Sequence, residues 1–195
     1  MKEVSIVVVI RNEINYIEEF CKNLNQFNTD IEIILVDNNS NDGTEKHLAL
    51  LKSTNIKVVH NKIGFTPESI NIGIDKAQGE FVVLCGARSL INVKYVTKCI
   101  EVLKSRSEIG CVGGLIFHEA KTFKGKMIAK AMGAKFGMGI NSFRSSKQSG
   151  YVDTVSVPCF RKKTFNDIGK FDVQLTRNQD EDFSYRILKT GKKIW

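Results

Sequence analysis

The chain has 195 residues, of which 42% are hydrophobic and 26% charged, with a formal net charge of +8. This length fits one domain, and this composition suffices to fill the core of a soluble protein. The sequence has no apolar run of about 18 residues, which argues against a membrane-spanning helix. Because Met1 leads almost directly into a strand-like run, we expect no secretory signal. The positive charge indicates an anionic partner: a nucleotide, a nucleic acid or a membrane surface.

Apolar, β-branched runs alternate with helical patterns in the first half of the chain. The expected strands are Val4–Ile10, Ile31–Val36, Ile56–His60, Phe81–Cys85 and Cys111–Phe117. Four helices are expected between these strands: one that begins after the N-cap Asn12, one over Thr44–Lys52, one that ends near Gly79, and one over Asn92–Ser105. In the third helix, Thr66 is the expected cap and Pro67 the first helical residue. Strands separated by helices at this spacing predict βαβ units and a mainly parallel sheet.

The five cysteines and three histidines show no metal-ligand spacing. The cysteines are odd in number, and no two of them form a Cys-x-x-Cys pair. Since most of them lie among apolar residues, we expect reduced core thiols in a cytosolic protein.

A basic stretch interrupts the pattern after His118. Between Lys121 and Lys147 the sequence has seven basic residues, four glycines and no acidic residue. Within it, Met127, Ile128, Ala131 and Met132 could form a short apolar face. Three interpretations stay open: a solvated surface excursion, a cover over an anionic ligand, or a patch that rests on anionic lipid.

Regular structure is expected again toward the end of the chain. The patterns predict a strand over Val152–Phe160, a short helix over Lys162–Ile168 and a last helix over Asp180–Lys189. Residues 192–195 resemble the start of another strand. We therefore expect a chain that stops inside its fold, as in a fragment or a shortened gene product.

Three polar segments follow predicted strands, and ligands of open α/β sheets bind beyond the carboxyl ends of strands. The first is the loop 37–44, where Asp37 could accept a hydrogen bond from a base N–H or a ribose hydroxyl. A polar turn in which Ser40, Asp42 or Thr44 caps the next helix is the alternative. No Gly-x-Gly-x-x-Gly is present, which disfavours a dinucleotide site.

The second segment is 85–89, and the third is 179–182 together with Arg186. Three carboxylates in the first turn of a helix suit its dipole, and Asp182 can pair with Arg186 four residues later. The alternative to such a salt-bridged helix start is that one of these carboxylates is a catalytic base in a cleft.

The order and spacing of these motifs resemble family 2 glycosyltransferases of the GT-A fold. The segments that carry the resemblance are 4–13, 36–44, 71–74, 77–81, 112–114, 152–155, 169–172 and 177–195. The later ones are similar to the exopolysaccharide branch related to succinoglycan biosynthesis. The resemblance implies an α/β, Rossmann-like α/β/α sandwich with a mainly parallel sheet. It implies one domain over 1–195, with a nucleotide-sugar half (1–117) and an acceptor half (118–195) that is shortened at its end.

The resemblance also implies an activity, which is an inverting transfer from a nucleotide-diphosphate sugar, usually a UDP-sugar. Asp180 would be the catalytic base, and Glu13, Asp37 and Asn39 would contact the donor. The acceptor would be a saccharide or a lipid-linked saccharide at the cytoplasmic, inner face of the plasma membrane, with a peripheral contact to anionic lipid. A nucleic-acid partner is not expected, because no recognition motif accompanies the charge.

The chain departs from the family at the position of its metal ligands. The family carries Asp-x-Asp, or Asp-x-His in the related branch, for Mg²⁺ or Mn²⁺. Here Gly86, Ala87 and Arg88 stand there, so no metal site of the usual kind is expected. Arg88 could itself contact the donor diphosphate. Two alternatives stay open: a metal-independent enzyme, and an inactive relative that still binds nucleotide.

Overall fold

The computed structural model describes residues 2–51, 53–115, 122–132 and 149–195. Its centre is a seven-stranded sheet of order β3-β2-β1-β4-β6-β5-β7. The strands are β1 (Val4–Ile10), β2 (Ile31–Asp37), β3 (Ile56–His60), β4 (Phe81–Gly86), β5 (Ile109–Gly114), β6 (Ser156–Arg161) and β7 (Lys193–Ile194). Only β6 runs antiparallel to its neighbours within this sheet. The predicted, mainly parallel sheet is confirmed.

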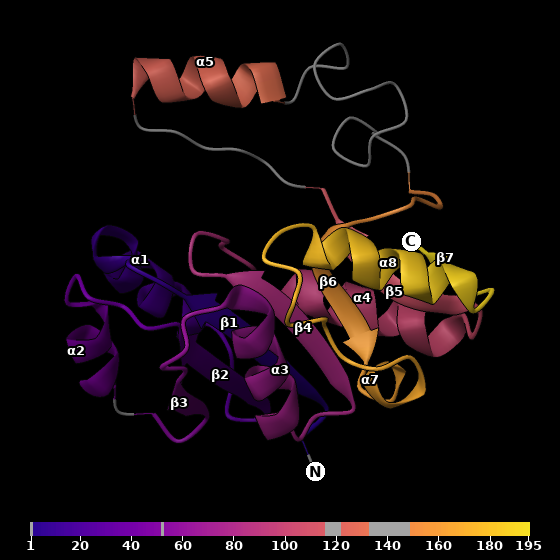
Figure 1. Ribbon diagram of the computed structural model, residues 1–195, viewed down its shortest axis with the longest axis horizontal. Helices are drawn as coiled ribbons and strands as arrows, with labels where there is room; N and C mark the ends of the chain where they lie inside the picture. Colours follow the sequence, from indigo (N-terminus) through magenta and orange to yellow (C-terminus); the bar gives the residue numbers. More distant parts are fainter. Residues whose placement is uncertain (1, 52, 116–121, 133–148) are drawn as a thin grey trace.

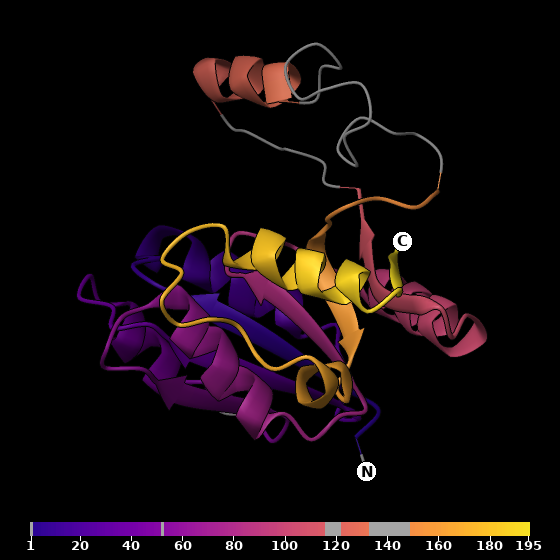
Figure 2. The same ribbon diagram turned by 45° about the vertical axis from the view of Figure 1, so that its right-hand side comes forward.

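Helices cover both faces of the sheet, which gives three layers (Figures 1 and 2). One face packs against α1 (Ile14–Leu24), α2 (Thr44–Ala49) and α4 (Val93–Ser105). The other face packs against α3 (Thr66–Lys76), α7 (Thr164–Asp167) and α8 (Gln179–Lys189). A further helix, α5 (Phe123–Met132), is drawn apart from the sheet in both views.

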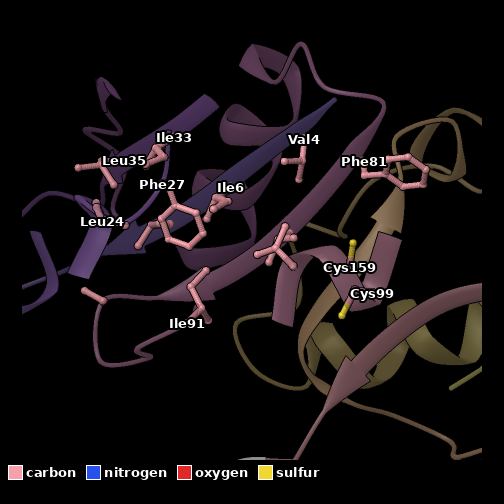
Figure 3. Packing of buried hydrophobic residues seen from close by; sticks show 14 of the residues in the cluster. Val4, Ile6, Leu24, Phe27, Ile33, Leu35, Phe81, Ile91, Cys99 and Cys159 are labelled. Carbon is pink, nitrogen blue, oxygen red and sulfur yellow. The ribbon is translucent and has the colours of Figure 1, made fainter. Parts of the chain in front are cut away.

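Strand alternation divides the core into two clusters. Along β1, Val4 and Ile6 belong to the cluster on the side of α1 and α4, which Figure 3 shows together with Leu24 and Cys99. Val7 belongs to the cluster on the side of α3. These side chains are at most 2% exposed. The sequence prediction of strands buried on both faces is therefore confirmed. It follows from the near-continuous apolar run, because a strand covered on one face alone would alternate with polar residues.

All five cysteines are free thiols, as predicted. Cys99 and Cys159 belong to the cluster in Figure 3, and Cys111 belongs to the cluster on the other face. Burial raises the pKa of Cys99 to about 11, so this thiol stays protonated and contributes packing rather than chemistry.

Two predicted helix caps are wrong. Asn12 does not cap α1: it has φ 55°, and its Oδ1 accepts from Asn41 N at 2.9 Å. Thr66 is the first residue of α3, so Pro67 takes the second position and Phe65 precedes the helix. In contrast, Asn92 caps α4 by accepting from the amide of Tyr95 at 2.8 Å.

The strands of the second half are shorter than predicted. β6 begins at Ser156 rather than at residue 152, because Val152 forms only a single bridge, with Ile194, outside the strand. β5 ends at Gly114, and residues 116–117 of the predicted strand lie outside the described ranges. The expected last strand is confirmed as β7.

The described part of the basic stretch is Thr122 and α5, and the rest, 121 and 133–147, lies outside the described residues. Large apolar side chains of α5 face solvent: Phe123 is 81%, Met127 55% and Ile128 61% exposed. Among the helices that the structure describes, none is long and apolar enough to span a bilayer.

Candidate functional site

A cavity of about 470 Å³ lies between α3 and α8 beyond the carboxyl ends of β1 and β4. Apolar side chains form most of its lining, with Ile70 from α3 and Phe183 from α8 on either side. Its polar lining residues are Arg11, Glu13, Asn38, Thr66, Ser89, Ser156, Gln179, Asp180 and Ser184. This volume and this mixture of an apolar wall with a few polar groups are typical of a small-molecule site.

Aromatic packing fixes the α8 side of the cavity. The rings of Phe171 and Phe183 stack with centroids 4.4 Å apart. The side chain of Asn71 on α3 donates to the carbonyl of Phe171 at 2.8 Å and accepts from its amide at 3.0 Å. α3 and the segment before α8 are thereby tied together, so the first turn of α8 has a defined position at the cavity.

Of the three carboxylates in that turn, Asp180 lines the cavity. Asp182 forms the predicted pair with Arg186, with 2.8 Å between Oδ2 and Nη2. Arg186 also donates to the carbonyls of Ile168 and Lys170, so this pair anchors α8. Glu181 is exposed and is not among the described lining residues. Asp180 is the carboxylate that this geometry offers to a ligand.

The loop 37–44 holds the turn between β1 and α1. Thr44 Oγ1 accepts from the amide of Glu13 at 2.9 Å, and Asp42 Oδ2 accepts from the amide of Ile14 at 3.0 Å. The hydrogen bond from the Thr44 hydroxyl lowers the pKa of Asp42, which keeps this capping carboxylate ionised. The loop is thus a capped polar turn that also places Glu13 at the rim of the cavity.

Asp37 and Asn39 do not line the cavity. Asp37 lies on the face of Ile33 and Leu35, with its Oδ2 3.4 Å from Nδ1 of His60. Its Oδ1 is buried and accepts no hydrogen bond from the described residues. Asn39 adopts φ 59° and lies against Gly64. Buried polar oxygens normally accept a hydrogen bond, and a bound ligand could supply the donor for this one, so Asp37 stays a candidate ligand contact.

Asn38 is a cavity residue that the sequence reading missed. Asn61 fixes its orientation: Asn61 Oδ1 accepts from the amide of Ile63, so Asn61 Nδ2 points toward Asn38. Asn38 Oδ1 therefore accepts from Asn61 Nδ2 at 3.4 Å and from Ser69 Oγ at 2.9 Å. Its Nδ2 group donates to no described residue and is available to a ligand. Successive side chains of a strand point to opposite faces of the sheet, so the residue after Asp37 could have been placed on the opposite face from the sequence.

The family comparison decides the class of this cavity. A family model described as glycosyl transferase family 2 matches residues 5–166. The chain belongs to this family. The matched residues include the strand ends and turns that carry Glu13, Asn38 and Arg88.

Curated relatives agree with this membership. The chain is 26% identical to "Dolichyl N-acetyl-alpha-D-glucosaminyl phosphate 3-beta-D-2,3-diacetamido-2,3-dideoxy-beta-D-glucuronosyltransferase" of Methanococcus voltae, over 100% of this chain and 64% of that protein. It is 22% identical to succinoglycan biosynthesis protein ExoA of Rhizobium meliloti, over 97% of this chain and 59% of that protein. The chain thus spans less than two thirds of the length of each.

Solved structures show the fold. S. aureus TarS in complex with UDP-GlcNAc superposes with a TM-score of 0.70 at 16% identity, over 99% of this chain and 56% of that chain. A mannosyltransferase of Pyrobaculum calidifontis in complex with GDP-Man and Mn²⁺ superposes with a TM-score of 0.69 at 18% identity, over 98% and 53%. The family 2 chain therefore has the GT-A fold that its sequence predicted.

Arg88 of this family 2 chain lies beside Glu13. Its Nε donates to both carboxylate oxygens of Glu13, at 3.0 and 2.8 Å, and its guanidinium carbon lies 4.9 Å from the ring centroid of Tyr16. The hydrogen bond that Arg88 donates to Glu13 raises the pKa of Arg88, so the guanidinium stays charged. The structure thus joins two of the predicted donor residues, and Glu13 shares the cavity with Asp180.

The divalent ion that the fold family implies does not fit the residues after β4. Gly86 has no side chain, Ala87 has a methyl group and Arg88 is a cation. Within the described ranges, no group of three or more His, Cys, Asp or Glu side chains could hold a metal. Glu13, the nearby carboxylate, is engaged by Arg88.

Proposed function

We propose that the chain transfers a sugar, with inversion, from a nucleotide-diphosphate sugar to a saccharide or lipid-linked acceptor in the synthesis of a cell-surface polysaccharide. The observation that carries the proposal is that Glu13, Asn38 and Asp180 line one cavity at the carboxyl edge of a family 2 sheet. The complexes of GT-A neighbours with UDP-GlcNAc and GDP-Man support a nucleotide-sugar donor.

In the proposed reaction Asp180 is the general base. Its carboxylate takes the proton of an acceptor hydroxyl, and that oxygen attacks the anomeric carbon on the face opposite the diphosphate. The bond from the anomeric carbon to the diphosphate breaks, and its electron pair leaves with the nucleoside diphosphate. A single displacement of this kind inverts the configuration at the anomeric carbon.

The donor nucleoside is proposed to be uridine. Asn38 Nδ2 can donate to a base carbonyl, and uracil presents two carbonyls beside one N–H. The unpaired Oδ1 of Asp37 can accept a single N–H, because its Oδ2 already faces His60. Guanine, in contrast, presents two parallel N–H donors and would use both oxygens.

Calorimetry with UDP tests the donor proposal. We expect UDP to bind, and Asn38→Ala to raise its Kd by about 3- to 10-fold, because one neutral hydrogen bond is lost. Asn166→Ala, which removes an exposed amide on α7, is the matched control and should leave the Kd unchanged. Failure of UDP and GDP to bind under any condition would remove the donor site. Equal affinity of wild type and Asn38→Ala would remove Asn38 from it.

A lipid-linked acceptor at the cytoplasmic, inner face of the plasma membrane is part of the proposal. The name of the M. voltae relative includes a dolichyl phosphate group. In this chain, α5 exposes Phe123, Met127 and Ile128 beside Lys124 and Lys126, a combination typical of a helix that lies on anionic lipid.

Vesicle flotation tests this contact. We expect binding to vesicles that contain phosphatidylglycerol and little binding to phosphatidylcholine alone. The double change Lys124→Glu and Lys126→Glu should weaken binding about tenfold or more, since each lysine near an anionic surface contributes about 1 kcal/mol. The same charge change at Lys94 and Lys98 on α4 is the control. Equal flotation of both double variants would contradict a role for α5.

A nucleotide-binding relative without transferase activity is the second candidate function. The replacement of the metal-ligand motif by Gly86, Ala87 and Arg88 favours it. Release of UDP from a panel of UDP-sugars, with acceptor present, distinguishes the two: the second candidate binds UDP but releases none.

A further inference from the structure

The ion pair between Arg88 and Glu13 lies where the chain leaves β4, next to the cavity. The side chain of Glu13 is 14% exposed, and that of Arg88 is 66% exposed. The carboxylate is therefore the fixed partner, held by the capped turn before α1, and the guanidinium extends from it toward solvent. Tyr16, in the first turn of α1, supports the guanidinium with its ring face.

This arrangement leaves most of the guanidinium free for a ligand. The hydrogen bonds to Glu13 use Nε, and within the described part of the chain neither Nη group donates a hydrogen bond. Four N–H donors in a planar fork remain, and such a fork matches the oxygens of a phosphate. A diphosphate is the ligand class that this geometry suits.

The charges of the pair equal those of a metal site. Two carboxylates and one divalent ion sum to zero, and one carboxylate and one guanidinium also sum to zero. In both cases a fixed anion positions a cation that faces the ligand. The P. calidifontis neighbour was solved with Mn²⁺ and its donor, whereas the residues after β4 in this chain supply a cation of their own.

We propose that Arg88, positioned by Glu13 and Tyr16, takes the place of the divalent ion at the donor diphosphate, so that donor binding needs no metal. This inference rests on the proposed function, because it concerns the diphosphate of the same donor. Arg88 is the ligand-contacting residue, and Glu13 is a positioning residue.

The test is titration of UDP and of uridine into the full chain, in EDTA and in Mn²⁺. For wild type we expect the same UDP Kd in both buffers, within about twofold. Arg88→Ala should raise the UDP Kd about 10- to 100-fold, the loss expected for hydrogen bonds from a charged donor, and leave the uridine Kd unchanged. Lys98→Ala, which removes an exposed lysine from α4, controls for net charge.

Glu13→Gln separates positioning from folding. It keeps the size of the side chain but removes the charge that holds Arg88. We expect weaker UDP binding, an unchanged uridine Kd and an unchanged Tm. UDP binding that requires Mn²⁺, or that survives Arg88→Ala, overturns the inference and leaves the proposed function standing. If neither UDP nor uridine binds in either buffer, the proposed function fails, and this inference fails with it.

Discussion

Replacement of Asp180 by asparagine is expected to lower kcat by about 10²- to 10⁴-fold, the contribution typical of a positioned general base. The amide keeps the shape of the carboxylate but cannot take the acceptor proton. Because Asp180 lies on the α8 side of the cavity and the proposed nucleoside contacts lie at the end of β2, the Kd for UDP should change less than about threefold. UDP release and calorimetry measure the two quantities on the same preparation.

The neighbouring carboxylate is the control for this prediction. Glu181→Gln removes one negative charge from the same helical turn, but Glu181 is exposed and is not a described lining residue of the cavity. Its kcat should stay within about twofold of wild type, because a screened surface charge contributes little. Undiminished turnover in Asp180→Asn would exclude the base role. An equal loss in both variants would point to the charge of the helix start instead.

The sequence was sufficient to predict the layers of the fold, because buried strands and helices have a characteristic spacing of apolar residues. The run from Val4 to Ile10 is apolar on both faces, and β1 has these bounds. Helix caps can be made by residues that are distant in the sequence, and such caps give no local sequence pattern. The amide of Ile14 is satisfied by Asp42, 28 residues away, rather than by the local Asn12. The antiparallel pairing of β6 with β4 and β5 likewise leaves no pattern in the residues of the strand itself.

The candidate site was predictable in its location but not in its detail. Residues that follow parallel strands meet at one edge, so Glu13 and Arg88 could be grouped without coordinates. Which of three adjacent carboxylates faces the cavity depends on the rotation of α8, which the stacking of Phe171 on Phe183 fixes. The contact of Asn38 depends on Asn61 and Ser69, which come from another turn and another helix.

The opposite edge of the sheet contains a buried carboxylate that is unrelated to the cavity. Glu32 on β2 is 3% exposed. Its Oε2 accepts from Ser5 Oγ at 2.6 Å and from the amide of Gln78 at 2.8 Å, and its Oε1 accepts from Lys57 Nζ at 2.7 Å. Ser5 Oγ accepts in turn from the amide of Gly79 at 2.9 Å. One carboxylate thus joins three strands and the turn before β4.

Glu32→Gln is expected to lower the free energy of unfolding by about 2–4 kcal/mol, since it leaves Lys57 without its ion-pair partner. In addition, the NH2 group of the glutamine cannot accept the hydrogen bond of whichever donor it faces, Lys57 or the amide of Gln78. For a chain of this size that loss of stability corresponds to a fall in Tm of about 4–16 °C. Urea unfolding followed by circular dichroism measures the difference. Glu18→Gln is the matched control, because the Glu18–Lys22 pair is 69% and 72% exposed and should contribute little.

The pH dependence of this stability difference tests whether the ionised carboxylate of Glu32 is its cause. Burial alone would raise the pKa of Glu32, but the hydrogen bonds from Lys57, Ser5 and Gln78 outweigh it and lower the pKa below the ordinary 4.5. A carboxyl whose pKa is lower in the folded than in the unfolded state stabilises the fold fully at pH values above its unfolded-state pKa. This stabilisation is lost as the pH falls through its folded-state pKa. The gap between wild type and Glu32→Gln should therefore be constant at neutral pH and shrink once the pH falls below about 4.5. A gap that stays constant through this range would show that the ionised form of Glu32 does not stabilise the fold.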